Sequence, residues 1–229
     1  MSRRHRSTTP PAFGAYTPDA GGSVELTETA RLETFSDGVF AIAITLLVLE
    51  IKVPPAHAAP GEALAPLARS LAALWPSYIG YALSFATIGT MWVNHHAMFR
   101  HIRRADRAFL LINVAFLMCI SFVPFSTAVL AEHLPDAEGR RAATLFYGGT
   151  FTAMALLYNA VWRYGVSRGR LLGPGADRAA VDAITRRYSW GPASYLAATL
   201  VAVASPIASV AVHVALAALY CLPERRNAR

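Results

Sequence analysis

The sequence has little charge and almost no cysteine. Only 15% of its 229 residues are charged, and its two cysteines, Cys119 and Cys221, lie inside apolar stretches. Neither a disulfide framework nor a thiolate metal site is therefore indicated. An HExxH motif, a phosphate-binding glycine loop and a plausible set of Ser, His and Asp are also missing, so nothing favours catalysis. We expect no enzyme and no resident cofactor.

Apolar residues are what the sequence has in quantity. Hydrophobic residues make up 55% of the chain, with a mean hydropathy of +0.37, which is too apolar for an ordinary water-soluble domain. The net charge of +7 and pI of about 9.8 can suggest nucleic acid, but the arginines lie in short clusters between apolar runs. We therefore predict an integral membrane protein in a lipid bilayer, with no nucleic-acid partner.

Six apolar segments predict an all-α protein with six transmembrane helices. Each is close to the roughly 20 residues that cross a bilayer, and they cover residues 34–53, 70–98, 107–130, 141–163, 188–204 and 206–222. Ser205-Pro206 predicts a tight hairpin between the last two segments. The sequence thus predicts a disordered tail over 1–30, a membrane domain over 31–222 and a second tail over 223–229.

The arginine clusters predict the orientation. Basic residues gather before the first segment, after the second, between the fourth and fifth, and after the last, whereas the other loops carry mixed charges. We therefore expect both termini in the cytoplasm of a multi-pass plasma-membrane protein. A rival interpretation is a cleavable secretory signal, because the run 39–49 precedes the small triplet Ala56-His57-Ala58. The long leading region and the charges at Asp37 and Glu50 count against it.

The first segment, Arg31 to Val53, carries the most informative pattern. At about 100° per residue, one helical stripe collects three branched apolar residues and a threonine, namely Ile42, Thr45, Leu46 and Leu49. Asp37 lies about 140° around the helix from Ile42. If the stripe faces a central axis, the carboxylate therefore points back into its own subunit.

A carboxylate carried into a membrane needs a partner. The predicted topology brings the end of the second segment to the depth of Asp37, and this end carries Trp92, Asn94, His95 and His96. We expect an imidazole donor and the Ser36 hydroxyl to hold the carboxylate charged, with Asn113 of the third segment as a further member.

Other interpretations of these residues stay open. An apolar stripe on a membrane helix is commonly a packing or lipid-facing surface. His95 and His96 point about 100° apart, so they are poor joint metal ligands and a hydrogen-bonding role is favoured. The alternative function is a proton-coupled secondary transporter with Asp37 and one of the two histidines as a proton relay. A non-conducting membrane scaffold is a third.

The motifs themselves resemble a known family. Arg31 followed by Phe35-Ser36-Asp37 and the run GVFAIAITLLVLEIKVP, together with WVNHH at the end of the second segment, resemble the transmembrane protein 175 potassium channels of endolysosomes and prokaryotes. Animal members carry two six-helix repeats, whereas this sequence has a single Phe-Ser-Asp. It therefore resembles the prokaryotic form, which assembles as a homotetramer.

The resemblance implies a pore formed by four first helices, with potassium as the permeant ion and no other metal. It places Ile42 at the narrowest hydrophobic constriction, Leu46 and Leu49 in further apolar rings and Thr45 in a hydroxyl layer. Such apolar rings close a pore by dewetting, and threonine oxygens can contact a partly dehydrated cation. No TVGYG filter is present. The expected structural polar network comprises Arg31, Phe35, Ser36, Asp37, Trp92, His95, His96 and Asn113.

Overall fold

The computed structural model describes residues 27–54, 64–167 and 169–221, and helices dominate them, as the sequence predicts. The elements in chain order are β1 (Thr27–Glu28), α1 (Ala30–Leu46), the 3-10 helix η1 (Leu47–Glu50), α2 (Leu64–Ala73), α3 (Trp75–Met98), β2 (Arg104–Ala105), α4 (Arg107–His133), α5 (Arg140–Ser167), α6 (Arg178–Ala204) and α7 (Pro206–Cys221). Most of the predicted tails, residues 1–26 and 223–229, lie outside the described residues.

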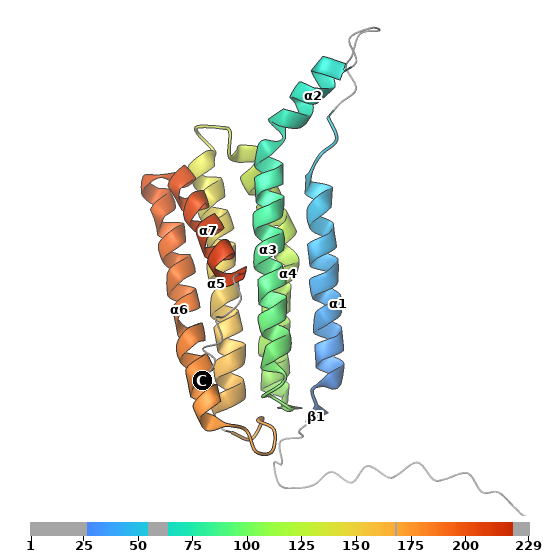
Figure 1. Cartoon of the computed structure of the whole chain (residues 1–229), viewed down its shortest axis with the longest axis vertical. Coiled ribbons are helices and arrows are strands. Elements are labelled where there is room, and N and C mark those ends of the chain that lie inside the picture. The colour runs from blue at the N-terminus through green and yellow to red at the C-terminus, as the bar shows by residue number, and fades with distance from the viewer. Residues whose placement is uncertain (1–26, 55–63, 168, 222–229) are drawn as a thin grey trace, which may run out of the picture.

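The long helices pack side by side into one bundle (Figure 1). α4 packs against α1, α3 and α5, while α6 packs against α5 and α7. α1 lies at one edge of the bundle, where its main neighbours are α3 and α4. Among the described residues of the single chain, one flank of α1 is therefore left without a neighbour.

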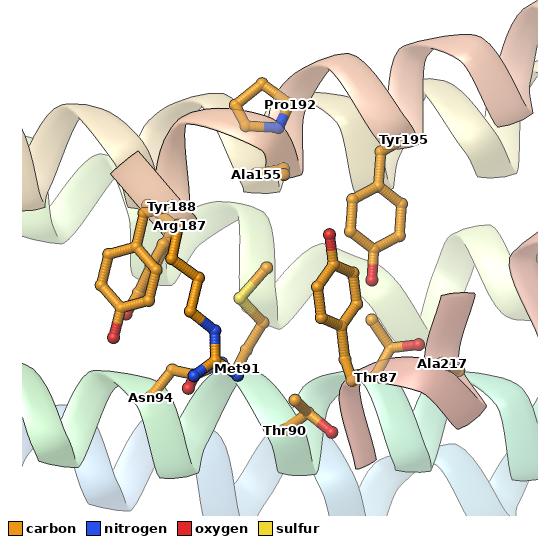
Figure 2. Close-up of a pocket in the computed structure, with 13 residues that line it drawn as sticks. Thr87, Thr90, Met91, Asn94, Ala155, Arg187, Tyr188, Pro192, Tyr195 and Ala217 are labelled. Atoms are coloured by element: carbon orange, nitrogen blue, oxygen red, sulfur yellow. The ribbon is translucent and has the colours of Figure 1, made fainter. Parts of the chain in front are cut away.

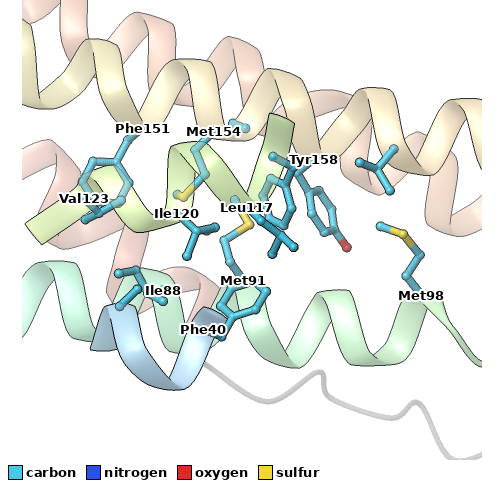
Figure 3. Packing of buried hydrophobic residues seen from close by; sticks show 14 of the residues in the cluster. Phe40, Ile88, Met91, Met98, Leu117, Ile120, Val123, Phe151, Met154 and Tyr158 are labelled. Carbon is cyan, nitrogen blue, oxygen red and sulfur yellow. The ribbon is translucent and has the colours of Figure 1, made fainter. Parts of the chain in front are cut away.

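The core lies between α3, α4 and α5 and is filled by large apolar side chains (Figure 3). Ile88, Ile120, Val123 and Met154 are all fully buried. Phe40 brings α1 into this core, with its ring centroid 5.9 Å from that of Phe116 on α4. Aromatic contacts of this kind add to the free energy of burying the rings.

The second predicted segment is broken into two helices. The sequence predicts one helix over 70–98, but α2 ends at Ala73 and α3 starts at Trp75, and the axes of the pair bend by 46°. Pro76 lies in the first turn of α3. A proline there costs no helical hydrogen bond, whereas inside a continuous helix its ring clashes with the preceding turn.

The fifth predicted helix starts ten residues early. The sequence predicts a helix from residue 188, but α6 begins at Arg178, so Arg186 and Arg187 lie on the helix. Asp177 is the reason, because its carboxylate accepts hydrogen bonds from the backbone N–H groups of Ala179 and Ala180 and so caps the helix. The predicted hairpin is confirmed, since α7 turns back at Ser205 and packs along α6, where the Ser209 hydroxyl donates to the Ala198 carbonyl at 2.7 Å.

Two short strands tie the start of α1 to the loop after α3. Thr27 pairs with Ala105 and Glu28 with Arg104 in an antiparallel ladder. The predicted disordered tail ran to residue 30, so its last four residues are ordered instead. Backbone pairing with β2, which an apolar pattern does not reveal, accounts for the difference.

The membrane crossings are shown only in part. Within the described ranges, two helices are long and apolar enough to cross a bilayer, Ala30–Glu50 and Arg107–His133, and the bent pair of α2 and α3 is a third. α7 is apolar but has only 16 residues. Six crossings therefore stay a prediction, although each of the six predicted segments corresponds to one helix or, for the second, to the bent pair.

The contact between α5 and α6 predicts a test of the packing. A Cβ added at Gly148 would lie 2.5 Å from Thr199 Oγ1 and 3.0 Å from both Thr199 Cβ and Cγ2, whereas one at the neighbouring Gly149 would meet nothing within 4 Å. Because three atoms of a β-branched residue crowd the site, Gly148→Ala should cost about 1–3 kcal/mol. The measurement is the thermal midpoint of the detergent-solubilised protein.

Gly149→Ala is the matched control. It should leave the midpoint unchanged or raise it, since alanine favours a helix over glycine. Equal midpoints for the two variants would contradict the close approach of α5 and α6 at Gly148.

Candidate pore helix and polar cluster

α1 has one buried face and one exposed face. Phe40 and Leu47 on the buried side are 1% and 0% exposed, whereas Ile42, Leu46 and Leu49 are 61%, 41% and 63% exposed. The change to a 3-10 helix at Leu47 keeps Leu49 in line with Leu46, because residues three apart eclipse each other at three residues per turn. The predicted stripe is thus a continuous apolar surface on the single chain.

Thr45 adds a hydroxyl to the exposed face. Its Oγ1 lies 3.0 Å from the carbonyl oxygen of Ala41 and 2.9 Å from that of Ile42. The hydroxyl therefore donates its proton into its own helix, which leaves the oxygen lone pairs available on the exposed side. An oxygen with its proton engaged in this way suits contact with a cation.

Behind the stripe, three helices are joined through the side chain of Asn113. Its Nδ2 donates to Ser36 Oγ on α1 at 3.1 Å, and its Oδ1 lies 2.9 Å from His95 Nε2 on α3. The Ser36 hydroxyl in turn donates to the Leu32 carbonyl oxygen at 2.8 Å. Ser36, His95 and Asn113 are all 0% exposed, and we call them the Ser36–Asn113–His95 cluster.

The directions of these hydrogen bonds follow from one another. The Ser36 proton is used on Leu32, so Asn113 must donate to Ser36 and present its carbonyl oxygen to His95. His95 Nε2 must then carry the proton. Its Nδ1 has no hydrogen-bond partner among the described residues.

Aromatic rings enclose the imidazole of His95. The Phe40, Phe99 and Phe116 centroids lie 5.4, 4.9 and 5.6 Å from the centre of the imidazole ring. The imidazole thus packs as one ring of the apolar core while it keeps its hydrogen bond to Asn113. This arrangement suits a fixed hydrogen-bond donor better than a group that exchanges protons with water.

Asp37 has a different partner from the one expected. Its Oδ1 accepts a hydrogen bond from Trp92 Nε1 at 2.9 Å, whereas we expected an imidazole and Ser36. His96 instead pairs with Glu33, with 2.9 Å between Nδ1 and Oε1. The polar network predicted from the sequence did not include Glu33, although Glu33 lies one turn before Asp37 and so shares its face of the helix.

The remaining motif residues lie outside these contacts. Arg31 is exposed and Phe35 is 57% exposed, so the structure of the single chain does not place either in the cluster. Across the described part of the chain, no group of three His, Cys, Asp or Glu side chains is arranged to hold a metal ion.

The bundle of long apolar helices, with an apolar stripe on its edge helix and a polar cluster behind it, is that of a helical membrane protein. Residues 31–124 match the family described as the endosomal/lysosomal potassium channel TMEM175. A potassium channel of Chamaesiphon minutus is 48% identical over 204 residues, covering 89% of this chain and 98% of its own length. The chain belongs to the TMEM175 family.

Further relatives agree with this assignment. A potassium channel of Streptomyces collinus is 42% identical over 196 residues, which cover 85% of this chain and 92% of that protein. The human endosomal/lysosomal proton channel TMEM175 is 39% identical over 99 residues, which are 42% of this chain and 20% of the human protein. These relatives are channels, and the chain is not an enzyme.

A solved structure shares the fold. The crystal structure of a lysosomal potassium-selective channel TMEM175 homolog from Chamaesiphon minutus aligns with a TM-score of 0.75 and 45% identity. The alignment covers 84% of this chain and 95% of that one. The chain therefore corresponds to the single-repeat, prokaryotic form of the family.

The Ser36–Asn113–His95 cluster predicts non-additive mutant stabilities. Asn113→Leu leaves the His95 donor buried without an acceptor, and it should cost about 1–3 kcal/mol. His95→Phe should cost a similar amount, because it leaves the Asn113 carbonyl unpaired. The double variant removes both polar groups, so its loss of stability should be smaller than the sum of the losses in the two single variants.

Thermal midpoints of the three detergent-solubilised variants provide the measurement. Trp92→Phe is a comparison variant, since its indole is 40% exposed and its loss should cost less than that of Asn113. Strictly additive midpoint shifts for Asn113→Leu and His95→Phe would show that the two side chains are not coupled.

Proposed function

We propose that the chain is one subunit of a homotetrameric, potassium-permeable cation channel whose pore is lined by α1 of each subunit. The observation that carries the proposal is the exposure of Ile42, Leu46 and Leu49 on a helix whose opposite face is buried. Lipid alone covers an apolar stripe, but a lipid-facing stripe has no use for the exposed Thr45 hydroxyl among its apolar residues. Four copies of the stripe around a common axis would instead form apolar rings and a hydroxyl ring, and the names of the bacterial relatives support a potassium path.

In this proposal Ile42 is the principal gate. Four isoleucines at one level form a ring narrow and apolar enough to expel water, and a dry ring is a barrier to ions. Leu46 and Leu49 form further apolar rings, and Thr45, exposed on the same face, supplies a hydroxyl layer between Ile42 and Leu46. Ions then cross the pore passively. Each subunit crosses the plasma membrane with six helices and has both termini in the cytoplasm.

The polar residues behind the stripe hold α1 in place in this proposal. The Ser36–Asn113–His95 cluster joins α1 to α3 and α4, and the Asp37–Trp92 hydrogen bond makes a second connection to α3. The transporter alternative needs Asp37 and a histidine in one relay. Asp37 and His95 are instead hydrogen-bonded to Trp92 and Asn113, and His96 is paired with Glu33, which favours a structural role.

Single-channel recording tests the proposed function. Purified protein in planar lipid bilayers should give passive currents, and their reversal potential should follow an imposed potassium gradient at constant pH. A saturable flux that requires a proton gradient would instead support the transporter. A reversal potential that follows only pH would assign the path to protons, as the name of the human relative states for that protein.

Replacing Ile42 tests the gate. Ile42→Asn should increase basal potassium current and weaken discrimination against sodium, because a polar ring stays wet. Leu111→Asn is the matched control, since Leu111 on α4 is 60% exposed and Ile42 is 61% exposed in the single chain. It should leave the current unchanged. An unaltered current in Ile42→Asn, or equal changes in both variants, would place the gate elsewhere.

A further inference from the structure

Four exposed arginines gather on the loop that joins α3 to α4. They are Arg100, Arg103, Arg104 and Arg107, and we call them the loop arginines. Among the residues that the structure describes, none of their side chains has a partner in a hydrogen bond or an ion pair. In the described part of the chain, their guanidinium groups are therefore donors without an acceptor.

The backbone of this loop is held in place on two sides. The N–H groups of Arg103 and Arg104 both donate to the Leu171 carbonyl oxygen, at 2.9 and 3.2 Å, and Ile102 is buried. On the other side, β2 pairs with β1. The loop arginines therefore extend from fixed positions, so an anion can bind them with little ordering of the main chain.

The loop lies where two candidate membrane helices begin. One of them, Ala30–Glu50, closely follows β1, and the other, Arg107–His133, begins with a loop arginine. Figure 1 shows β1 at the same end of the bundle as the last turn of α3. The loop arginines are therefore at the level of the lipid headgroups, where anionic lipids attract basic side chains.

The acidic residues of the loop and of β1 leave most of this positive charge in place. Asp106 is buried and forms an ion pair with Arg170. Glu28 lies opposite Arg104 in the ladder between β1 and β2, so it offsets the charge of one loop arginine. The remaining charge favours an anionic partner.

The exposed face of α4 favours a lipid over a soluble anion. Starting from Arg107, exposed apolar side chains recur at Leu111, Val114 and Met118. Steps of four, three and four residues place these side chains in line with Arg107 on one face of the helix. A positive group followed by an apolar stripe matches a phospholipid, which has a charged headgroup followed by acyl chains.

We propose that the loop arginines bind the phosphate groups of anionic phospholipids. Their guanidinium groups donate charge-assisted hydrogen bonds to the phosphate oxygens, and the acyl chains lie along the apolar stripe of α4. This surface belongs to the loop and to α4 and does not include the α1 stripe. The proposal is therefore independent of the proposed channel.

Native mass spectrometry of the purified full-length protein tests this surface. The protein should retain dioleoyl phosphatidylglycerol and should bind the zwitterionic dioleoyl phosphatidylcholine much more weakly. Arg103→Gln/Arg107→Gln should lower the affinity for phosphatidylglycerol by about fivefold for each arginine, as expected for basic residues at an anionic membrane. Arg100→Gln/Arg104→Gln should also lower it, and this second pair keeps the test decisive if the first folds poorly.

Arg178→Gln/Arg186→Gln is the matched control. Both arginines are exposed on α6, which begins at the same end of the bundle (Figure 1). This variant loses the same charge away from the loop, so it should bind phosphatidylglycerol like the wild type. Arg187 on the same helix is not used, because it lines a cavity between α3, α5, α6 and α7 (Figure 2).

Three results would overturn the proposal. Equal losses of affinity in the loop variants and in the α6 control would show diffuse attraction to a basic end of the bundle. Unchanged affinity in both loop variants would place the lipid elsewhere. Displacement of the lipid by glycerol 3-phosphate at equal concentration would show that the loop takes a soluble anion and that the acyl chains contribute nothing.

Discussion

The rotation of α1 depends on the Asn113 side chain. Its amide joins Ser36 on α1 to His95 on α3, and it does so at a depth that water does not reach. Ser36 is thereby turned inward, and Phe40, Ala43 and Leu47 follow it at helical spacing into the core. The opposite face must then carry Ile42, Leu46 and Leu49 outward. A buried serine in the motif therefore decides which residues are available to a pore.

A second connection holds the start of α1. The pairing of β1 with β2 ends beside Asp106, which caps α4 by accepting from the Phe109 N–H at 2.8 Å. Burial raises the pKa of Asp106, but hydrogen bonds from the Phe109 N–H and the Tyr164 hydroxyl and the charge of Arg170 outweigh it and hold the pKa below its ordinary value. The charged carboxylate so joins α4 to the end of α5 and to the loop beyond it, directly after the strand β2 that pairs with β1 at the start of α1.

The sequence predicts much of this arrangement because apolar length and helical spacing depend on local chemistry. The six helical segments, the hairpin at Ser205 and the stripe through Ile42 all follow from residues within one helix. Contacts between helices are harder to predict from the sequence. Trp92 and His95 lie three residues apart on nearly the same face of α3, so only the packed rotation of α3 decides that Trp92, not an imidazole, reaches Asp37. The early start of α6 was missed because its first turns are polar and are held by a cap.

The central claim is that four copies of α1 meet around one axis with Ile42 at its narrowest level. A cryo-EM structure of the full-length protein in lipid nanodiscs measures this directly. The account predicts a fourfold assembly with the four Ile42 side chains in mutual contact range at the axis and Ser36 directed away from it. An assembly in which Ile42 faces lipid, or in which another helix surrounds the axis, would contradict it.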